Sequence, residues 1–194
     1  MNAFENIVGQ LLEEEDYWIR QSVKVEISKD DKRRLDKLTM PRPEIDIVAF
    51  NVKKNELLFV ECKSLIDSNA GVRYGAIFPV PNQSKKDKSR AKHYKLFTDK
   101  AWREIVSDSM SKQYLKQGLI KKNTKIKYAL AAGKILVGQE VKLKEAFRKA
   151  GWILYTPEMI AAGIRKLAEK GWEDNAVTMT AKLITRNEKK RSAI

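Results

Sequence analysis

The segment from Arg42 to Ser64, RPEIDIVAFNVKKNELLFVECKS, constrains the fold more than any other part of the sequence. Two apolar runs flank a short polar break, so the segment predicts a hairpin with strands over residues 45–52 and 57–63. These strands carry Asp46, Glu61 and Lys63 where a buried strand ordinarily has no charge. Because a buried charge is costly unless it is paired or binds a ligand, the hairpin is the candidate functional region.

The register of the hairpin decides whether the three charged side chains can meet. Side chains alternate between the two faces of a strand, so Glu61 and Lys63 point the same way. If Asn51 pairs with Glu56 across a four-residue turn, Asp46 stands opposite Glu61. A three-residue turn would move Asp46 by one position and separate it from them. A common site therefore implies the four-residue turn.

Two carboxylates on neighbouring strands point to a divalent cation. Directly opposed residues have Cβ atoms roughly 5 Å apart, and each carboxylate raises the pKa of the other unless a cation lies between them. Oxygen ligands favour Mg²⁺, with Mn²⁺ as the alternative, bound by Asp46 and Glu61. Lys63 would orient or help deprotonate an attacking water and stabilise charge on a phosphate. The competing interpretation is an Asp46–Lys63 salt bridge with Glu61 in water.

The charge balance predicts a polyanionic partner. The chain has 39 Lys and Arg against 25 Asp and Glu, a formal charge of +14, which makes nucleic acid the leading partner. A single Cys and a single His exclude a zinc site built from these residues. Tyr74, His93 and Tyr94 could stack on bases. The predicted phosphate contacts are Arg73, Lys85, Lys86, Lys88, Arg90, Lys92 and Lys95, in a segment that is either a solvated loop or one that orders on DNA.

The order of predicted elements gives the fold class. Strands come first and later alternate with helices, which predicts an α/β (α+β) fold with a mixed sheet of about five strands and helices on both faces. Residues 29–43 should be an exposed connection, and residues 64–97 a long loop. No apolar run suits a membrane span or signal peptide, so we expect a cytoplasmic protein without a membrane partner. Helices are predicted over residues 2–15, 99–117, 139–151 and 157–171, with weaker helical character after 172, and strands over 17–28, 45–52, 57–63, 125–134 and 152–156.

The runs PEIDIVAFN and LLFVECKS resemble the PD-(D/E)XK nuclease superfamily, the restriction-endonuclease-like fold that includes restriction enzymes and archaeal Holliday-junction resolvases. In that family an acid on the second core strand precedes an acid-x-Lys unit on the third, which maps to Asp46, Glu61 and Lys63. An acid on the first helix often completes the set, and Glu5 holds that place. The family proline directly precedes the aspartate, whereas Pro43 stands three residues before Asp46, which leaves Glu44 as a rival or auxiliary acid.

The resemblance implies a magnesium-dependent endonuclease that acts on DNA and needs no small-molecule cofactor. A water would attack the phosphorus in line, and the 3′ oxygen would leave. The Cys62 carbonyl would join Asp46 and Glu61 as a metal ligand, and Glu5 would serve a second metal or a water. Gln113 matches a polar position that some relatives use near the site, although a solvated helix residue is the favoured interpretation.

The resemblance also implies one nuclease-like domain over residues 1–194, with the family core at about 2–132 and an elaboration at about 133–194. Many members of the family are dimers, so a homodimer is an expected possibility. Two alternatives stay open. The chain could be a non-catalytic nucleic-acid-binding protein that keeps the fold, or a nuclease directed at RNA.

Overall fold

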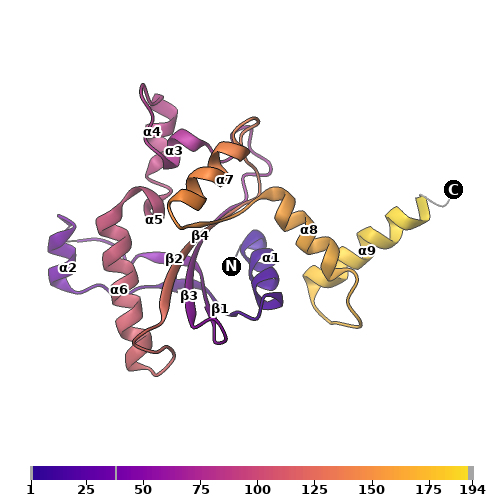
Figure 1. Ribbon diagram of the computed structural model, residues 1–194, viewed down its shortest axis with the longest axis horizontal. Coiled ribbons are helices and arrows are strands. Elements are labelled where there is room, and N and C mark those ends of the chain that lie inside the picture. Colours follow the sequence, from indigo (N-terminus) through magenta and orange to yellow (C-terminus); the bar gives the residue numbers. More distant parts are fainter. Residues whose placement is uncertain (1, 38, 192–194) are drawn as a thin grey trace.

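A single mixed sheet organises the protein. The computed structural model describes residues 2–37 and 39–191 (Figure 1). The strand order is β1-β2-β3-β4-β5, with antiparallel pairing from β1 to β3 and parallel pairing from β3 to β5. The predicted mixed sheet of about five strands is therefore confirmed. The strands are β1 (Trp18–Lys24), β2 (Glu44–Asn51), β3 (Glu56–Lys63), β4 (Lys125–Ala132) and β5 (Ile153–Tyr155).

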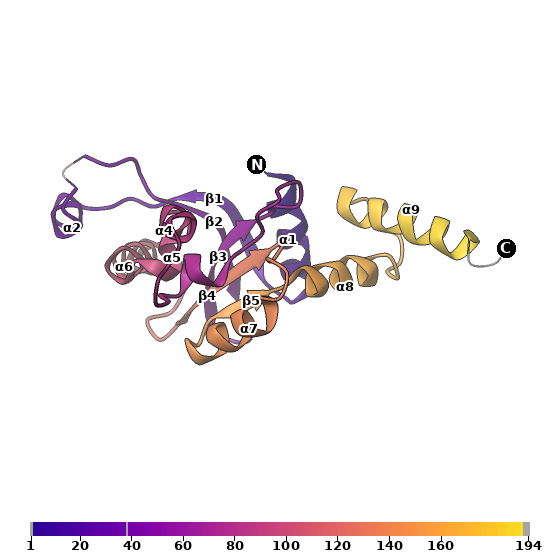
Figure 2. The same ribbon diagram turned by 90° about the horizontal axis from the view of Figure 1, so that it is seen from above.

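Helices cover both faces of the sheet, as predicted. Helix α1 (Ala3–Glu14) and helix α8 (Pro157–Leu167) pack on one face, while α6 (Lys100–Lys116) and α7 (Glu140–Lys149) pack on the other. Figures 1 and 2 show α1 and α6 on opposite sides of the strands. Alternating side chains of β3 pack into the hydrophobic cores on the two faces of the sheet, so this strand is buried on both faces.

Helix α1 begins and packs as its sequence predicts. The Asn2 side chain accepts a hydrogen bond from the Phe4 N–H at 3.0 Å, which caps the helix. Phe4, Val8 and Leu12 recur at helical spacing and are buried against the sheet. This packing fixes the first turn of α1, and with it Glu5, above one end of the sheet.

The segment predicted as a loop over residues 64–97 contains short helices instead. They are α3 (Tyr74–Ile77), α4 (Lys85–Ala91) and α5 (Lys95–Thr98). Ser84 caps α4 by accepting a hydrogen bond from the Asp87 N–H at 3.1 Å. Helices of four to seven residues are too short to show a repeating apolar pattern, which is why periodicity missed them.

Two regions extend away from the sheet. Residues 25–37 and 39–43 form an arm that carries α2 (Lys29–Arg34) near its tip (Figure 2). The exposed connection was predicted over residues 29–43, and the strand predicted over residues 17–28 ends at Lys24 instead. Helix α9 (Ala176–Arg191), which confirms the helical character expected after residue 172, lies beyond α8 (Figure 1). Within the described ranges, no helix has the length and apolar character needed to cross a membrane.

Candidate functional site

The hairpin between β2 and β3 has the register that a shared site requires. Asn51 pairs with Glu56 across the four-residue turn, and the ladder runs from there to Ile47 and Val60. One further step in this register sets Asp46 opposite Glu61. The predicted turn length is therefore confirmed.

The backbone pairing between β2 and β3 ends before Asp46, and the Asp46 side chain makes the next hydrogen bond to β3. The Asp46 Oδ2 atom accepts a hydrogen bond from the Cys62 N–H at 2.7 Å, in the position where a β2 carbonyl would otherwise pair. On the other edge of β3, the Gly133 N–H donates to the Lys63 carbonyl at 2.8 Å. Backbone groups of successive residues point to opposite edges of a strand, so the Cys62 carbonyl faces β2, on the same side as Asp46.

The sheet is irregular at this position in both β1 and β2. Ile47 packs against the α1 face and Ile45 against the α6 face, so the alternation of β2 inverts at Asp46. The β1–β2 ladder skips Ser22 and Asp46, and Ser22 has a positive φ of 51°. Such backbone costs roughly 1–3 kcal/mol and tends to gather at functional sites. The irregularity frees the Asp46 carboxylate to turn toward the end of β3.

Glu61 and Lys63 form an ion pair on the end of β3. The Lys63 ammonium donates to the Glu61 carboxylate, and the two side chains are only 24% and 15% exposed. The partner of Lys63 in the structure is therefore Glu61, and the Asp46–Lys63 salt bridge considered from the sequence is not the arrangement observed. Asp46 is nevertheless close enough for its charge to raise the pKa of Lys63.

Glu5 reaches the same place from α1. Its side chain is buried, and burial raises its pKa above 4.5, with the Asp46 carboxylate as the next cause. A hydrogen bond from the Asn2 backbone opposes this rise, so Glu5 serves the helix N-terminus and faces Asp46 at once. The charge of Glu44 also raises the pKa of both Glu5 and Asp46. The four acids named from the sequence thus lie close enough to influence one another.

The pKa values of Asp46, Glu61 and Lys63 are all raised above their ordinary values. Burial raises the pKa of Asp46 above 3.8, while the Cys62 N–H and the Lys63 charge oppose the rise. Burial also raises the pKa of Glu61 above 4.5, aided by Asp46 and Glu5 and opposed by Lys63. Burial lowers the pKa of Lys63, but its acidic neighbours raise this pKa by a larger amount, so the net pKa lies above 10.5. Lys63 is therefore a charged hydrogen-bond donor near neutral pH.

The donor set suits an oxygen-preferring cation that keeps water ligands. Among residues 2–37 and 39–191, no group of three His, Cys, Asp or Glu side chains is arranged to hold a metal. Asp46 and Glu61 supply two carboxylates, and Mg²⁺ is commonly held by one or two carboxylates with water and substrate oxygens completing the shell. The geometry thus fits a two-carboxylate site rather than a closed protein cage.

Tyr94 lies near the site, and the sequence did not predict this position. It was considered for stacking on bases, but it is buried and cannot reach a base. Burial raises the pKa of its phenol, and the charges of Lys63 and Arg90 oppose that rise. Tyr94 therefore lies near enough to Lys63 on β3 and to Arg90 on the basic helix α4 to feel both charges. Only the long-range packing of α5 reveals this position.

Some of the residues predicted to bind nucleic acid are exposed, and others already bond to groups of the protein. Arg73 pairs with the buried carboxylate of Asp87, which fastens α4 to the segment before α3. The Gln113 amide donates to the Glu26 carbonyl at 3.0 Å and so ties α6 to the arm. The cations of the basic segment stay accessible in whole or in part: Lys85, Lys86, Lys88 and Lys92 are exposed, and Arg90 and Lys95 are half-buried.

Comparison with known proteins gives only distant likenesses. No protein-family model matches the chain, and no curated protein matches it significantly. Two solved structures are similar. One is a protein of unknown function, AF1548, with a TM-score of 0.36 and 15% identity over 80% of this chain and 62% of that one. The other is the MunI restriction endonuclease in complex with cognate DNA, with a TM-score of 0.33 and 12% identity over 86% of this chain and 87% of that one. The chain therefore spans less than two thirds of the length of AF1548.

Proposed function

We propose that the chain is a metal-dependent nuclease that hydrolyses DNA phosphodiester bonds at Asp46, Glu61 and Lys63. One observation carries the proposal. The Asn51–Glu56 register and the break in β2 bring an acid on one strand to the acid-x-Lys unit of the next, in a partly buried group of like charges. A structural role alone gives no reason to crowd acids in this way, because their repulsion and burial raise their pKa.

Each side chain has a distinct task in this proposal. Asp46 and Glu61 would hold the cation, with the Cys62 carbonyl directed to the same side. A bound divalent cation would neutralise charge on the phosphate and lower the pKa of a water molecule. Lys63, which stays protonated, would donate hydrogen bonds to the attacking water or to a phosphate oxygen instead of removing a proton. Glu5, whose raised pKa makes its carboxylate a stronger base, would accept a proton from water directly or through a second water.

The surroundings support a nucleic-acid substrate. The formal charge of +14 attracts a polyanion. Lys63 and Arg90 of the basic helix α4 both lie near enough to Tyr94 for their charges to lower its pKa, which places α4 close to the site. A phosphate backbone held along α4 would therefore pass the ends of β2 and β3. Phosphate contacts from lysines position such a backbone without reading sequence.

The test is magnesium-dependent nicking of a supercoiled plasmid. Asp46→Asn, Glu61→Gln and Lys63→Met should each abolish nicking, while Glu158→Gln, an exposed acid on α8, should leave it unchanged. Persistent nicking by all three site variants would refute the assignment. A panel of linear duplex, flapped, four-way-junction and RNA substrates would then define what is cut.

A binding protein without catalysis is the second candidate. It is favoured by the Glu61–Lys63 ion pair, because a lysine that already neutralises one acid reduces the need for a cation. In that case the protein would bind DNA but would not nick it in Mg²⁺ or Mn²⁺. The same plasmid assay, run beside a gel-shift measurement, separates the two functions.

A further inference from the structure

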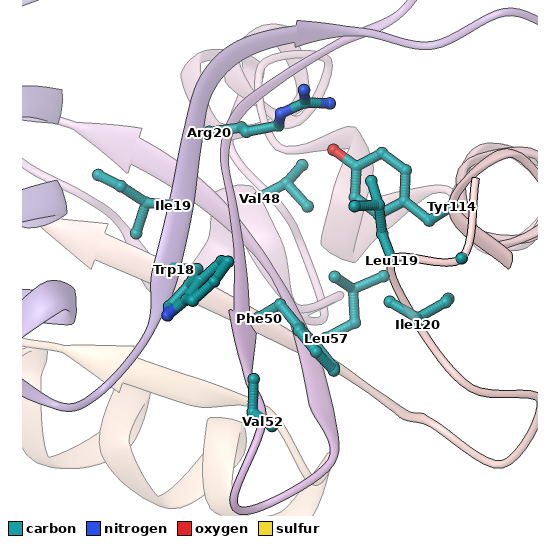
Figure 3. A pocket seen from close by; sticks show the side chains of 11 residues that line it. Trp18, Ile19, Arg20, Val48, Phe50, Val52, Leu57, Tyr114, Leu119 and Ile120 are labelled. Carbon is teal, nitrogen blue, oxygen red and sulfur yellow. The ribbon is translucent and has the colours of Figure 1, made fainter.

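A cavity lies at the other end of the sheet from the acids. It has a volume of about 420 Å³ and is walled by strands β1 to β3 and the segment after α6 (Figure 3). Its lining is mostly apolar, and the polar side-chain groups in it are the Arg20 guanidinium, the Tyr114 phenol and the Trp18 indole N–H. The apolar wall consists mainly of Trp18, Val48, Phe50, Leu57, Leu119 and Ile120. This volume is in the range of sites that hold small ligands, roughly 300–1,000 Å³.

Tyr114 gives the cavity an unmet hydrogen-bonding group. The residue is 6% exposed, and within the part of the chain that the structure describes its hydroxyl has no hydrogen-bond partner. Figure 3 shows the hydroxyl oxygen directed toward β1 and β2, on the side of Arg20. The Arg20 guanidinium lies 6.0 Å from the centre of the Tyr114 ring. A buried hydroxyl without a partner is unfavourable, so a ligand that bonds to it would be bound more tightly.

Trp18 offers a flat apolar surface beside these polar groups. Its side chain is 78% exposed, and its cross-strand neighbour is Phe50. Open aromatic rings next to cations are the means by which proteins hold unstacked bases, since every base has a π-face. In a chain with a formal charge of +14, an anionic ligand with an aromatic ring fits this combination better than an apolar peptide does.

We propose that the cavity binds an unpaired nucleobase of single-stranded or locally opened nucleic acid. The base stacks on Trp18, and Arg20 contacts the adjoining phosphate. The Tyr114 hydroxyl, which has less than 1 Å² of accessible surface, bonds to the polar edge of the base once the side chains around it move aside. The inference rests on the proposed function only in taking nucleic acid as the ligand. Trp18 pairs with Phe50, which is four residues from Asp46 along β2, about 13 Å at the usual rise of a strand, so the surface on which the base stacks lies apart from the acids.

The test is the affinity of the full chain for a fluorescent single-stranded oligonucleotide and for a blunt duplex, measured without metal. Trp18→Ala should weaken single-strand binding about tenfold. It should leave duplex binding unchanged, because bases inside a duplex are already stacked and covered. Tyr114→Phe should weaken single-strand binding by a smaller factor. The matched control is Trp172→Ala, which removes an 88% exposed tryptophan beyond α8 and should change neither affinity.

Several results would overturn the inference. Equal single-strand affinity in Trp18→Ala and the native chain would show that the cavity does not bind a base. A fall in affinity for duplex and single strand alike would show the same. Either result would leave the nuclease proposal intact. Loss of self-association in Trp18→Ala during sedimentation, with unchanged oligonucleotide affinity, would assign the cavity to a protein contact. A native chain that binds no nucleic acid would reject this inference and the proposed substrate together, and a chain that binds but never nicks would reject the nuclease proposal alone.

Discussion

The side chain of Asp46 completes the end of strand β3, because its Oδ2 atom accepts a hydrogen bond from the Cys62 N–H at 2.7 Å. The β2–β3 ladder has ended by this point, so the Cys62 amide depends on Asp46 for its partner. Asp46 therefore has a structural contact as well as its proposed catalytic one. Substitutions at this position must be chosen to separate the two.

Asp46→Asn and Asp46→Ala are predicted to differ in stability but not in activity. Asparagine keeps a carbonyl oxygen that can accept from the Cys62 N–H, whereas alanine leaves that buried amide without a partner, at a cost of roughly 1–3 kcal/mol. Both variants should lose metal-dependent nicking, because neither supplies the carboxylate. Urea denaturation and plasmid nicking measure the two effects. Equal stability of the two variants would show that the hydrogen bond contributes little.

The stability of Asp46→Asn relative to the native chain should depend on pH. Burial raises the folded-state pKa of Asp46 above 3.8, so the folded protein holds this proton more tightly than the unfolded chain does. The ionised carboxylate therefore costs stability once the pH rises through the folded pKa, by about 1.4 kcal/mol for each unit of the shift. Asparagine has no such titration.

The advantage of Asp46→Asn should accordingly grow from about pH 4 toward neutrality and then level off. The facing groups Glu5, Glu44, Glu61 and Lys63 are present in both proteins, so the difference between the two proteins reports the Asp46 carboxylate together with its effect on the pKa of Glu5, Glu61 and Lys63. Free energies of unfolding from urea titrations across this range provide the measurement. An advantage that shrinks as the pH rises would mean that the pKa of Asp46 is lowered, not raised.

The sequence predicted that Asp46, Glu61 and Lys63 lie together because its signals are local. Alternation along a strand places Glu61 with Lys63, and the length of one turn places Asp46 opposite them. The arrangement within the site could not be predicted in this way. The inversion at Ser22 and Asp46 depends on a positive φ in a neighbouring strand, and the choice of Glu61 as the partner of Lys63 depends on side-chain geometry.

The basic segment was harder to predict because its structure depends on distant contacts. Asp87 is the only acid in residues 85–95, a run of cations in the sequence, yet it is buried and pairs with Arg73, fourteen residues earlier. Tyr94 looked available for stacking but is buried beside Lys63. Short helices capped by single serines, such as the one that Ser84 begins, leave almost no periodic signal.

Helix α4 should supply salt-dependent phosphate contacts. Replacing Lys85 and Lys86 with glutamine removes two exposed cations, and each lost contact lowers the slope of log K against log salt by about 0.9. The slope for duplex DNA should thus fall by up to about 2 units. Arg165→Gln with Lys166→Gln removes the same charge from an exposed stretch of α8 and is the matched control. Equal slopes in the two double variants would mean that general attraction, not α4, binds the backbone.

Gly133 holds the ends of β3 and β4 together at the site, and its replacement by alanine should damage both stability and activity. A Cβ atom at this position would overlap the carbonyl oxygen of Ser64 and come within 3.1 Å of the Phe4 ring. Relief of the overlap requires the backbone after Lys63 to move, since a carbonyl oxygen cannot rotate away as a flexible side chain can. Overpacking of this kind costs roughly 1–3 kcal/mol.

The same displacement would shift Lys63 and Glu61 relative to Asp46, and misplacement of about 1 Å can cost on the order of a hundredfold in rate. Gly133→Ala should therefore lower the urea midpoint and slow nicking even where the protein is fully folded. Gly171→Ala is the control, because a Cβ atom there meets nothing within 4 Å. Full nicking by folded Gly133→Ala would show that the active arrangement does not depend on the close approach of β4 to the end of β3.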